Sequence, residues 1–121
     1  MKVLAPISVG ELLDKITILD LKRERIKDDD KLKHVINEYI DLMHLSSDLD
    51  LEDDLFKDLK NINSDLWYIE SDIREKEKNL EFDEDFIELA RMVYVKNDIR
   101  SRIKNDINKK YDSYFIEQKS Y

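Results

Sequence analysis

The chain has no cysteine, one glycine and one proline among its 121 residues. Because cysteine is absent, the chain cannot form a disulfide framework, a thiolate metal site or a cysteine nucleophile. Glycine and proline supply most tight turns and helix breaks, so their scarcity predicts few turns and long uninterrupted segments. These absences favour an all-α protein of the cytoplasm.

Long apolar runs and an excess of positive charge are missing as well. No run approaches the ~20 apolar residues of a membrane span, and the first eight residues lack the apolar core of a signal peptide. The 21 Lys and Arg against 29 Asp and Glu give a net charge of −8, which repels phosphate backbones and anionic lipid headgroups. We therefore expect a cytoplasmic protein that binds neither nucleic acid nor a membrane.

The residues that are present predict helices throughout. Hydrophobic and charged residues each make up 41% of the chain and recur at spacings of three and four, which is typical of amphipathic helices. We predict one domain over 1–121, an antiparallel bundle of four main helices whose last two form a long C-terminal hairpin. The expected helices run from 9 to about 27, from the aspartate turn at 28–30 to 45, from about 52 to 78, and from a cap at 83 to about 110. They are flanked by an extended lead-in at 1–7 and a tail at 111–121 that folds back.

The first of these segments has the most complete helix start. Ser8 and Glu11 have the spacing of a capping box, in which each side chain accepts from the backbone amide of the other. Ile7 and Leu12 flank this cap as a hydrophobic staple. The helix that follows is apolar on two sides, so we expect it to lie between several partners and to organise the fold.

The segment from about 52 to 78 carries an apolar seam that steps by four and three residues, like a coiled coil. Phe56, Trp67 and Tyr68 lie off that seam and give this helix a second apolar surface. The long hairpin should also project beyond the two shorter helices and expose apolar side chains. Both features lead us to expect a homodimer.

Residues for metal, nucleophilic or phosphate chemistry are sparse. His34 and His44 lie ten apart and lack a second histidine at helical ligand spacing. The acidic connection at 46–54 has no glycine and lacks the alternating ligands of a calcium loop. The only glycine, Gly10, is not in a phosphate loop, and no serine stands in an elbow motif. We therefore expect no metal, no cofactor and no catalytic residue, and do not expect an enzyme.

One cluster of charged residues is a candidate ligand site. Lys96 and Arg100 project from the apolar arc of the last helix, where they could line a groove against the acids of the first helix, including Asp20. Such a groove would suit a small anion. Nine residues make up the candidate site: Glu11, Asp14, Lys15, Arg91, Tyr94, Lys96, Asn97, Arg100 and Lys104.

Two interpretations of this cluster remain open. The run from Glu11 to Ile16 superficially resembles the opening helix of the all-helical chorismate mutases, which bind a dicarboxylate between helices. That resemblance implies an anion-binding protein or a minor enzyme. Alternatively, acids and bases on neighbouring helices simply neutralise each other, because structural ion networks imitate sites.

Four segments of the chain resemble a family of short bacterial and phage proteins known as DUF6165. They are PISVGELLDKITIL (6–19), LWYIESDIREKE (66–77), FDEDFIELARMVYVKNDIRSRIKNDIN (82–108) and EQKSY (117–121). The resemblance implies a bacterial or phage protein of the cytoplasm, but it supplies no activity and no catalytic residue. It directs attention to the polar residues inside those segments: Ser8, Glu11, Asp14, Lys15, Arg91, Tyr94, Asn97, Asp98, Arg100, Lys104, Lys119 and Tyr121.

Two function classes follow from the sequence. The first is a helical interaction or scaffold protein that self-associates through surplus helical faces, with a further protein partner possible. The second is a small-anion binder or minor enzyme that uses the Lys- and Arg-lined groove. The arrangement of Lys96 and Arg100 discriminates between them, because they are either paired with acids or directed into a cavity.

Overall fold

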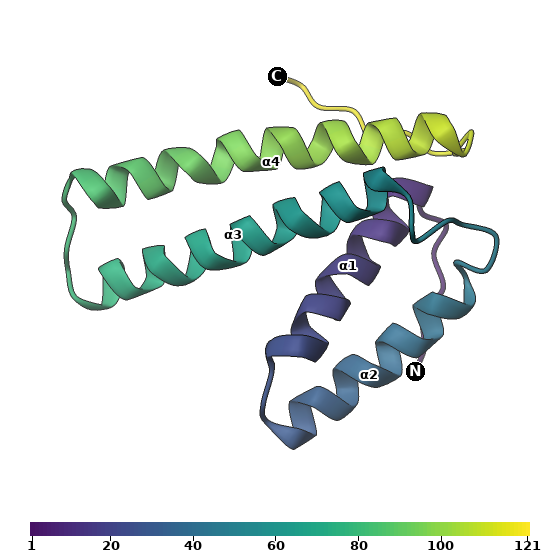
Figure 1. The fold of residues 1–121 in the computed structure, drawn as a ribbon, viewed down its shortest axis with the longest axis horizontal. Helices are drawn as coiled ribbons and strands as arrows, with labels where there is room; N and C mark the ends of the chain where they lie inside the picture. Colours follow the sequence, from purple (N-terminus) through teal and green to yellow (C-terminus); the bar gives the residue numbers. More distant parts are fainter.

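The computed structural model describes residues 1–121 and contains four helices and no strand (Figure 1). This confirms the all-α prediction and the number of helices. The helices are α1 (Val9–Arg25), α2 (Asp29–His44), α3 (Asp54–Lys78) and α4 (Glu84–Lys110). Their predicted bounds differ from these by about two residues, at the end of α1 and the start of α3.

The longest elements, α3 and α4, form an antiparallel hairpin; α1 lies against one half of it, and α2 lies on the far side of α1 (Figure 1). Helix α1 contacts each of the other three helices, whereas α2 contacts α1 alone. The prediction that α1 organises the fold is therefore confirmed. We call residues 54–67 and 96–110 the proximal half of the hairpin, and residues 68–95, which project away from α1 and α2, the distal half.

The hydrophobic core lies where α1 crosses the proximal half. Its six members come from three helices, because each contributes the side chains that recur on one face. They are Leu12, Leu13 and Ile16 of α1, Leu59 and Ile62 of α3, and Ile107 of α4. No helix combines the length and hydropathy that a bilayer-spanning segment needs.

The capping box at α1 is only half formed. Ser8 Oγ accepts from the Glu11 amide at 3.0 Å, as predicted. The Glu11 side chain does not reach back to Ser8; it accepts from Lys104 Nζ of α4 at 2.7 Å instead. The Glu11 carboxylate therefore pairs with the charged Lys104 on another helix rather than with the backbone amide of Ser8. The cap predicted within the aspartate turn at 28–30 falls on Asp28, and the cap predicted at Asp83 is confirmed; each accepts from an amide three residues on.

The aromatic residues off the α3 seam are partly used inside the protomer. Phe56 packs against the core, which corrects its assignment to a dimer surface. The Arg25 guanidinium lies over the rings of Trp67 and Tyr68, 5.3 and 4.7 Å from their centroids. Of the three, only Tyr68 remains exposed. The apolar surface available to a partner therefore has to be sought elsewhere on the hairpin.

Candidate functional site

The candidate site begins where the first turn of α1 crosses the last turns of α4. A Cβ atom placed on Gly10 would lie 2.5 Å from the Lys104 carbonyl oxygen and 2.9 Å from Asn108 Oδ1. The first contact is to backbone, which cannot rotate away. Only glycine allows the two helices to approach this closely, and that explains why the single glycine stands inside a helix.

The free amides of the α1 N-terminus are satisfied at this crossing. Asn108 Oδ1 accepts from the Gly10 amide at 2.7 Å, and Ser113 Oγ accepts from the Val9 amide at 3.0 Å. Ser8 accepts from a third amide. An open helix N-terminus attracts anions because these donors lack partners. Here Asn108 and Ser113, from the other end of the chain, accept hydrogen bonds from two of these amides. The α1 N-terminus therefore joins the first helix to the C-terminal part of the chain.

One turn further along α1, a layer of polar side chains is buried between three helices. Asp14 is 1% exposed and accepts from Asn63 Nδ2 of α3 at 2.8 Å and from Arg100 Nε of α4 at 3.0 Å. The second Asp14 oxygen accepts from Arg100 Nη2. Asn63 also donates to Thr17 Oγ1 at 2.7 Å, and this hydroxyl donates to the Asp14 carbonyl. We call Asp14, Thr17, Asn63 and Arg100 the polar layer.

Every polar atom that faces Asp14 is a donor, which is what a buried carboxylate requires. Arg100 holds both carboxylate oxygens, the geometry that gives the strongest ion pairs. The hydrogen bonds to the Asp14 carboxylate in turn raise the pKa of the Arg100 guanidinium above its ordinary value. The guanidinium therefore stays charged, and the layer joins α1, α3 and α4 at one point.

Lys104 lies beside this layer and is contacted by acids from two directions. Its ammonium donates to Glu11 Oε2 at 2.7 Å and lies 3.9 Å from Asp14 Oδ2, both on α1. Glu117 of the C-terminal tail approaches it to 3.4 Å. Only 10% of the Lys104 side chain is exposed. The predicted fold-back of the tail is confirmed by this contact.

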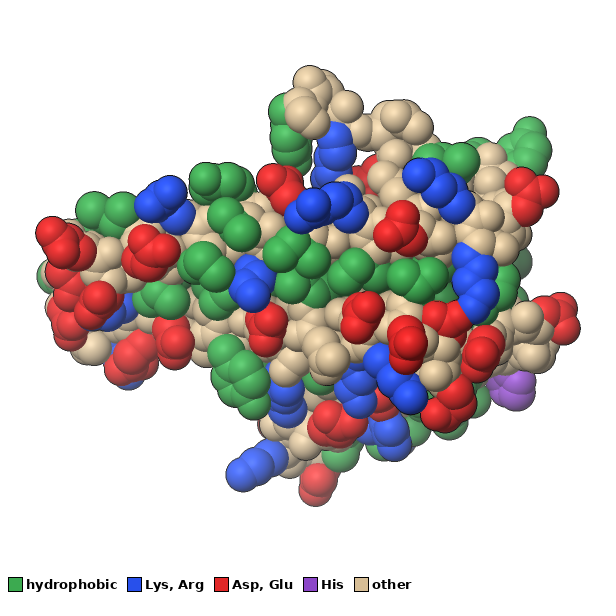
Figure 2. Space-filling view, turned by 45° about the horizontal axis from the view of Figure 1, so that its top comes forward, with side chains coloured by type: hydrophobic (Ala, Val, Ile, Leu, Met, Phe, Trp, Pro, Cys, Tyr) green, Lys and Arg blue, Asp and Glu red, His purple; other side chains and the backbone are tan.

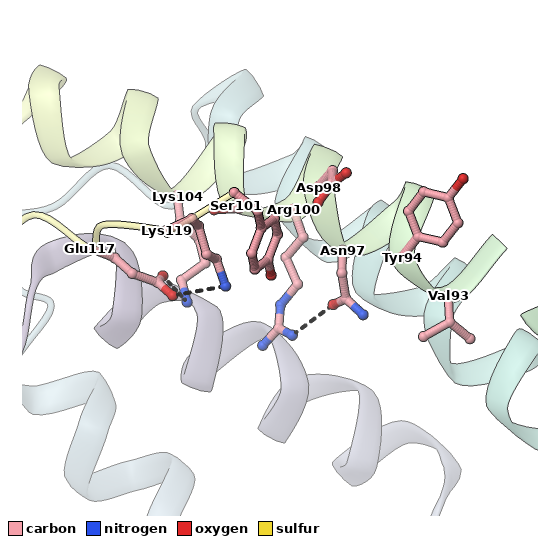
Figure 3. Close-up of a pocket in the computed structure, with 10 residues that line it drawn as sticks. Val93, Tyr94, Asn97, Asp98, Arg100, Ser101, Lys104, Glu117 and Lys119 are labelled. Atoms are coloured by element: carbon pink, nitrogen blue, oxygen red, sulfur yellow. Dashed lines mark hydrogen bonds and ion pairs between the residues drawn. The ribbon is translucent and has the colours of Figure 1, made fainter. Parts of the chain in front are cut away.

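A pocket of about 690 Å³ opens between α4 and the tail (Figure 3). Glu117 bridges Lys104 and Lys119, with 3.2 Å between Glu117 Oε1 and Lys119 Nζ. These two lysines, Lys119 before Lys104, hold the pKa of the Glu117 carboxyl below its ordinary value of 4.5. Ten residues line the pocket: Val93, Tyr94, Asn97, Asp98, Arg100, Ser101, Lys104, Glu117, Lys119 and Tyr121.

The structure brings together six of the nine predicted site residues. Glu11 and Asp14 of α1 meet Arg100 and Lys104 of α4 in direct ion pairs. The other two, Tyr94 and Asn97, line the adjoining pocket, where the Asn97 amide oxygen accepts from Arg100 at 3.3 Å.

Three predicted members lie outside the pocket and outside the ion pairs between α1 and α4. Arg91 is exposed and pairs with Glu88 of its own helix, and Lys96 pairs with Asp65 of α3 at 3.4 Å. Lys15 is exposed and lies 3.9 Å from the Glu11 carboxylate. None of the three lines the pocket.

A fourth correction concerns Asp20, which was expected to face the groove. It pairs with Lys60 of α3 at 2.7 Å and with Arg23 at 2.6 Å, and the Arg23 pair is the one that its spacing predicts. The spacing of residues along α1 predicted which face of the helix carries Asp20, but it could not predict that this face meets Lys60 of α3.

Residues outside the predicted set complete the site. Asn63 and Thr17 satisfy the buried carboxylate, while Asn108 and Ser113 cap α1. Glu117 supplies the tail contact. Two sequence signals point to them: a lone glycine inside a helix, and polar residues at positions that alternate with apolar ones on a buried face.

The charged side chains that meet between α1 and α4 are paired with one another. Arg100 and Lys96, the two cations that discriminate the function classes, are both paired with acids. No group of three or more His, Cys, Asp or Glu side chains is arranged to hold a metal ion. The candidate site is therefore an internal network of ion pairs with an open pocket along one side.

Fold and site define a class: an all-helical protein in which a short helical pair is locked by a buried ion network onto one half of a long helical hairpin. A family model described as "Family of unknown function (DUF6165)" matches residues 1–121, the whole chain, so the chain belongs to that family. Searches of curated proteins and of solved structures find no match.

Proposed function

We propose that this chain is a cytoplasmic helical interaction protein that self-associates through the distal half of its α3–α4 hairpin. The observation that carries the proposal is a set of large apolar side chains exposed beyond the reach of α1. Figure 2 shows hydrophobic side chains over this part of the hairpin, in a row that continues along the molecule. We call the following residues the distal patch: Leu80 (73% exposed), Phe82 (56%), Ile87 (56%), Tyr94 (57%) and Val95 (36%).

The distal patch continues a face that α1 covers elsewhere. Ile87, Ala90, Tyr94, Asn97, Ser101, Lys104 and Asn108 recur on α4 at spacings of three and four, so they form one stripe along the helix. The C-terminal members of this stripe meet α1 at the Gly10 crossing. Its N-terminal members are apolar and have no helix over them. A second helix laid along α4 would complete the same stripe.

The exposed area supports a second copy as the occupant. One protomer exposes 8665 Å², whereas a compact monomer of its mass, 14.6 kDa, is expected to expose about 6,900 Å². Part of the difference belongs to the extended N-terminal segment and the tail. A standard interface buries about 800 Å² per partner, so the projecting hairpin can supply the remainder as a dimer contact.

The proposal also predicts how association depends on salt. Each chain carries a net charge of −8, so two copies repel at long range. Salt screens that repulsion and strengthens apolar association at the same time. Dimerisation is therefore expected to tighten as NaCl is raised, opposite to the behaviour of an interface held by ion pairs.

Sedimentation equilibrium tests the proposal, with a mass of about 29 kDa, twice the 14.6 kDa of one chain, expected at micromolar concentration. Ile87→Ser removes an exposed side chain of the distal patch and should return the mass toward the monomer. Ile40→Ser is the matched control, because Ile40 is 48% exposed and lies on α2, which contacts α1 and not the hairpin. A monomer mass for the wild type at every salt concentration, or equal effects of the two variants, would refute the proposal.

A further inference from the structure

We propose that the pocket along α4 binds a small organic anion, and that the Glu117 carboxylate occupies the place of the ligand's charged group when the site is empty. The tail is then an intramolecular competitor. The proposal does not depend on self-association, because it rests on Lys104, Glu117 and Lys119 rather than on the distal patch.

The three acids around Lys104 are held in different ways. Glu11 and Asp14 are fixed on α1, and Asp14 is bound twice by Arg100. Glu117 lies in the segment after residue 113, which has no regular secondary structure. Of the three carboxylates, that of Glu117 is the one carried by a segment outside the helices.

The tail is weakly attached beyond its anchor. Ser113 is buried, bonded to the Val9 amide, and donates to the Phe115 carbonyl. After residue 115, the one hydrogen bond or ion pair to the helical body is that of Glu117 with Lys104 at 3.4 Å. Tyr121 is 88% exposed although it borders the pocket. Little buried area therefore opposes a ligand that takes over this ion pair.

The charge balance explains why an internal acid would compete. Around the pocket three cations face four acids, so the site as it stands is net negative. They are Arg100, Lys104 and Lys119 against Glu11, Asp14, Asp98 and Glu117. Withdrawal of the Glu117 charge restores balance and leaves Lys104 and Lys119 without their shared carboxylate.

The lining sets the ligand class. Two ammonium groups are compact point charges that suit a carboxylate or a phosphate, and the hydroxyl of Ser101 and the amide of Asn97 offer hydrogen bonds beside them. A volume of about 690 Å³ lies within the usual range for small-molecule sites. We infer a small organic anion with a polar body; an extended polyanion such as nucleic acid is disfavoured by the net charge of the chain.

Glu117→Gln tests this directly. Backbone amide NMR shifts of Ser101 and Lys104 are followed while succinate, or inorganic phosphate in a separate arm, is added against NaCl of equal ionic strength. Removal of the competing charge should lower the apparent Kd about 3- to 10-fold relative to wild type. This factor corresponds to the share of wild-type molecules in which a partly exposed ion pair holds the site closed. The stronger arm identifies the preferred charged group.

Two further variants complete the experiment. Glu81→Gln is the matched control, because Glu81 also pairs with a lysine at 3.2 Å but at the tip of the hairpin, and it should titrate as wild type. Lys119→Gln removes an exposed cation of the site without touching the core and should weaken binding several-fold. The proposal is overturned if Glu117→Gln and wild type titrate identically, or if neither anion shifts these amides beyond the NaCl reference.

Discussion

The two halves of the α3–α4 hairpin reverse the usual assignment of side chains to core and surface. The proximal half buries Asn63 and Lys104 together with Asp14, whereas the distal half exposes Phe82 and Ile87. Hydropathy alone would predict the opposite. The difference shows that coverage by α1 decides which side chains are buried in this protein, and that charged partners on α1 make the burial of Lys104 tolerable.

The reason lies in helix length. Helix α1 has 17 residues and α3 and α4 have 25 and 27, so at ~1.5 Å per residue α1 ends long before the hairpin does. The proximal half is a three-helix assembly with specific polar contacts. The distal half is a two-helix ribbon that cannot bury its outer faces alone.

The largest expected effect comes from breaking the polar layer of the proximal half. Arg100→Met leaves the charge of Asp14, 1% exposed, without its bidentate partner. Loss of one member of a buried pair typically costs 3–5 kcal/mol, and we expect about 3 kcal/mol because Asn63 and Lys104 remain. Urea unfolding measures the change in the free energy of unfolding.

Lys96→Met is the control for that variant, since the Asp65 partner of Lys96 has a half-exposed side chain and can be solvated. We expect a change within about 0.5 kcal/mol. The double variant Asp14→Leu/Arg100→Met removes both charges and should recover much of the loss. Equal costs for Arg100→Met and Lys96→Met would show that the polar layer is not a buried ion network.

The next effect is at the helix crossing. Gly10→Ala places a Cβ atom 2.5 Å from the Lys104 carbonyl oxygen, so α1 and α4 must move apart. We expect a loss of about 2 kcal/mol from overpacking, although alanine is the better helix former by about 1 kcal/mol. The reverse exchange in the exposed distal half, Ala90→Gly, should cost about 1 kcal/mol through propensity alone. A stabilised Gly10→Ala protein would contradict the close crossing.

A smaller effect is expected at the α1 cap. Ser8→Ala removes the acceptor for the Glu11 amide and should cost about 1 kcal/mol, measured as a lower urea midpoint at constant slope. Glu11→Gln keeps the cap, because the Glu11 side chain faces Lys104 rather than Ser8. Helix α1 should therefore remain capped in that variant, and its first-turn amides should keep their protection from hydrogen exchange.

The smallest effect separates two ion networks. Asp20 with Lys60 is proximal and partly buried, whereas Asp83 with Lys76 is exposed at the distal turn. Burial raises the pKa of Asp20, but hydrogen bonds from Lys60 and Arg23 outweigh it, so that pKa lies below its ordinary value of 3.8. The hydrogen bond from Lys76 lowers the pKa of Asp83 as well.

Since both folded-state pKa values are lowered, both pairs stabilise the fold above pH 3.8, and their contribution is lost as the pH falls through the lowered values. Double-mutant cycles at neutral pH should give a coupling for Asp20–Lys60 that survives 1 M NaCl. The coupling for Asp83–Lys76 should vanish there, because exposed charges are screened. Equal salt sensitivity would remove this distinction between the halves.

Local signals predicted the fold well. Spacings of three and four residues identified all four helices, and cap residues at Ser8, Asp28 and Asp83 marked three starts correctly. Two bounds missed by two residues. Helix α1 ends at Arg25 in a basic run without such a marker, and the Asp53 cap of α3 stands among several consecutive acids that could each have capped the helix.

The site was only partly predictable because it depends on the crossing of helices. Periodicity placed Arg100, Lys96 and Arg91 on one stretch of α4, but the extent of α1 decides which of them meets an acid. Arg91 precedes Arg100 by about 14 Å along the helix axis, outside the part that α1 covers. Asn63 satisfies Asp14 from α3, a pairing that no pattern within either helix contains. The lone glycine was the available clue to where the crossing lies.

The cap of α1 also has a consequence for biosynthesis. Its acceptors Asn108 and Ser113 follow Gly10 and Val9 by 98 and 104 residues. The ribosome therefore releases the first helix long before Asn108 and Ser113, which accept from its first amides. Such distant pairings form late because the intervening chain must be ordered first. The native structure of this small protein is thus completed only when the end of its last helix has emerged, so that chains interrupted before that point lack the joint between first and last helix.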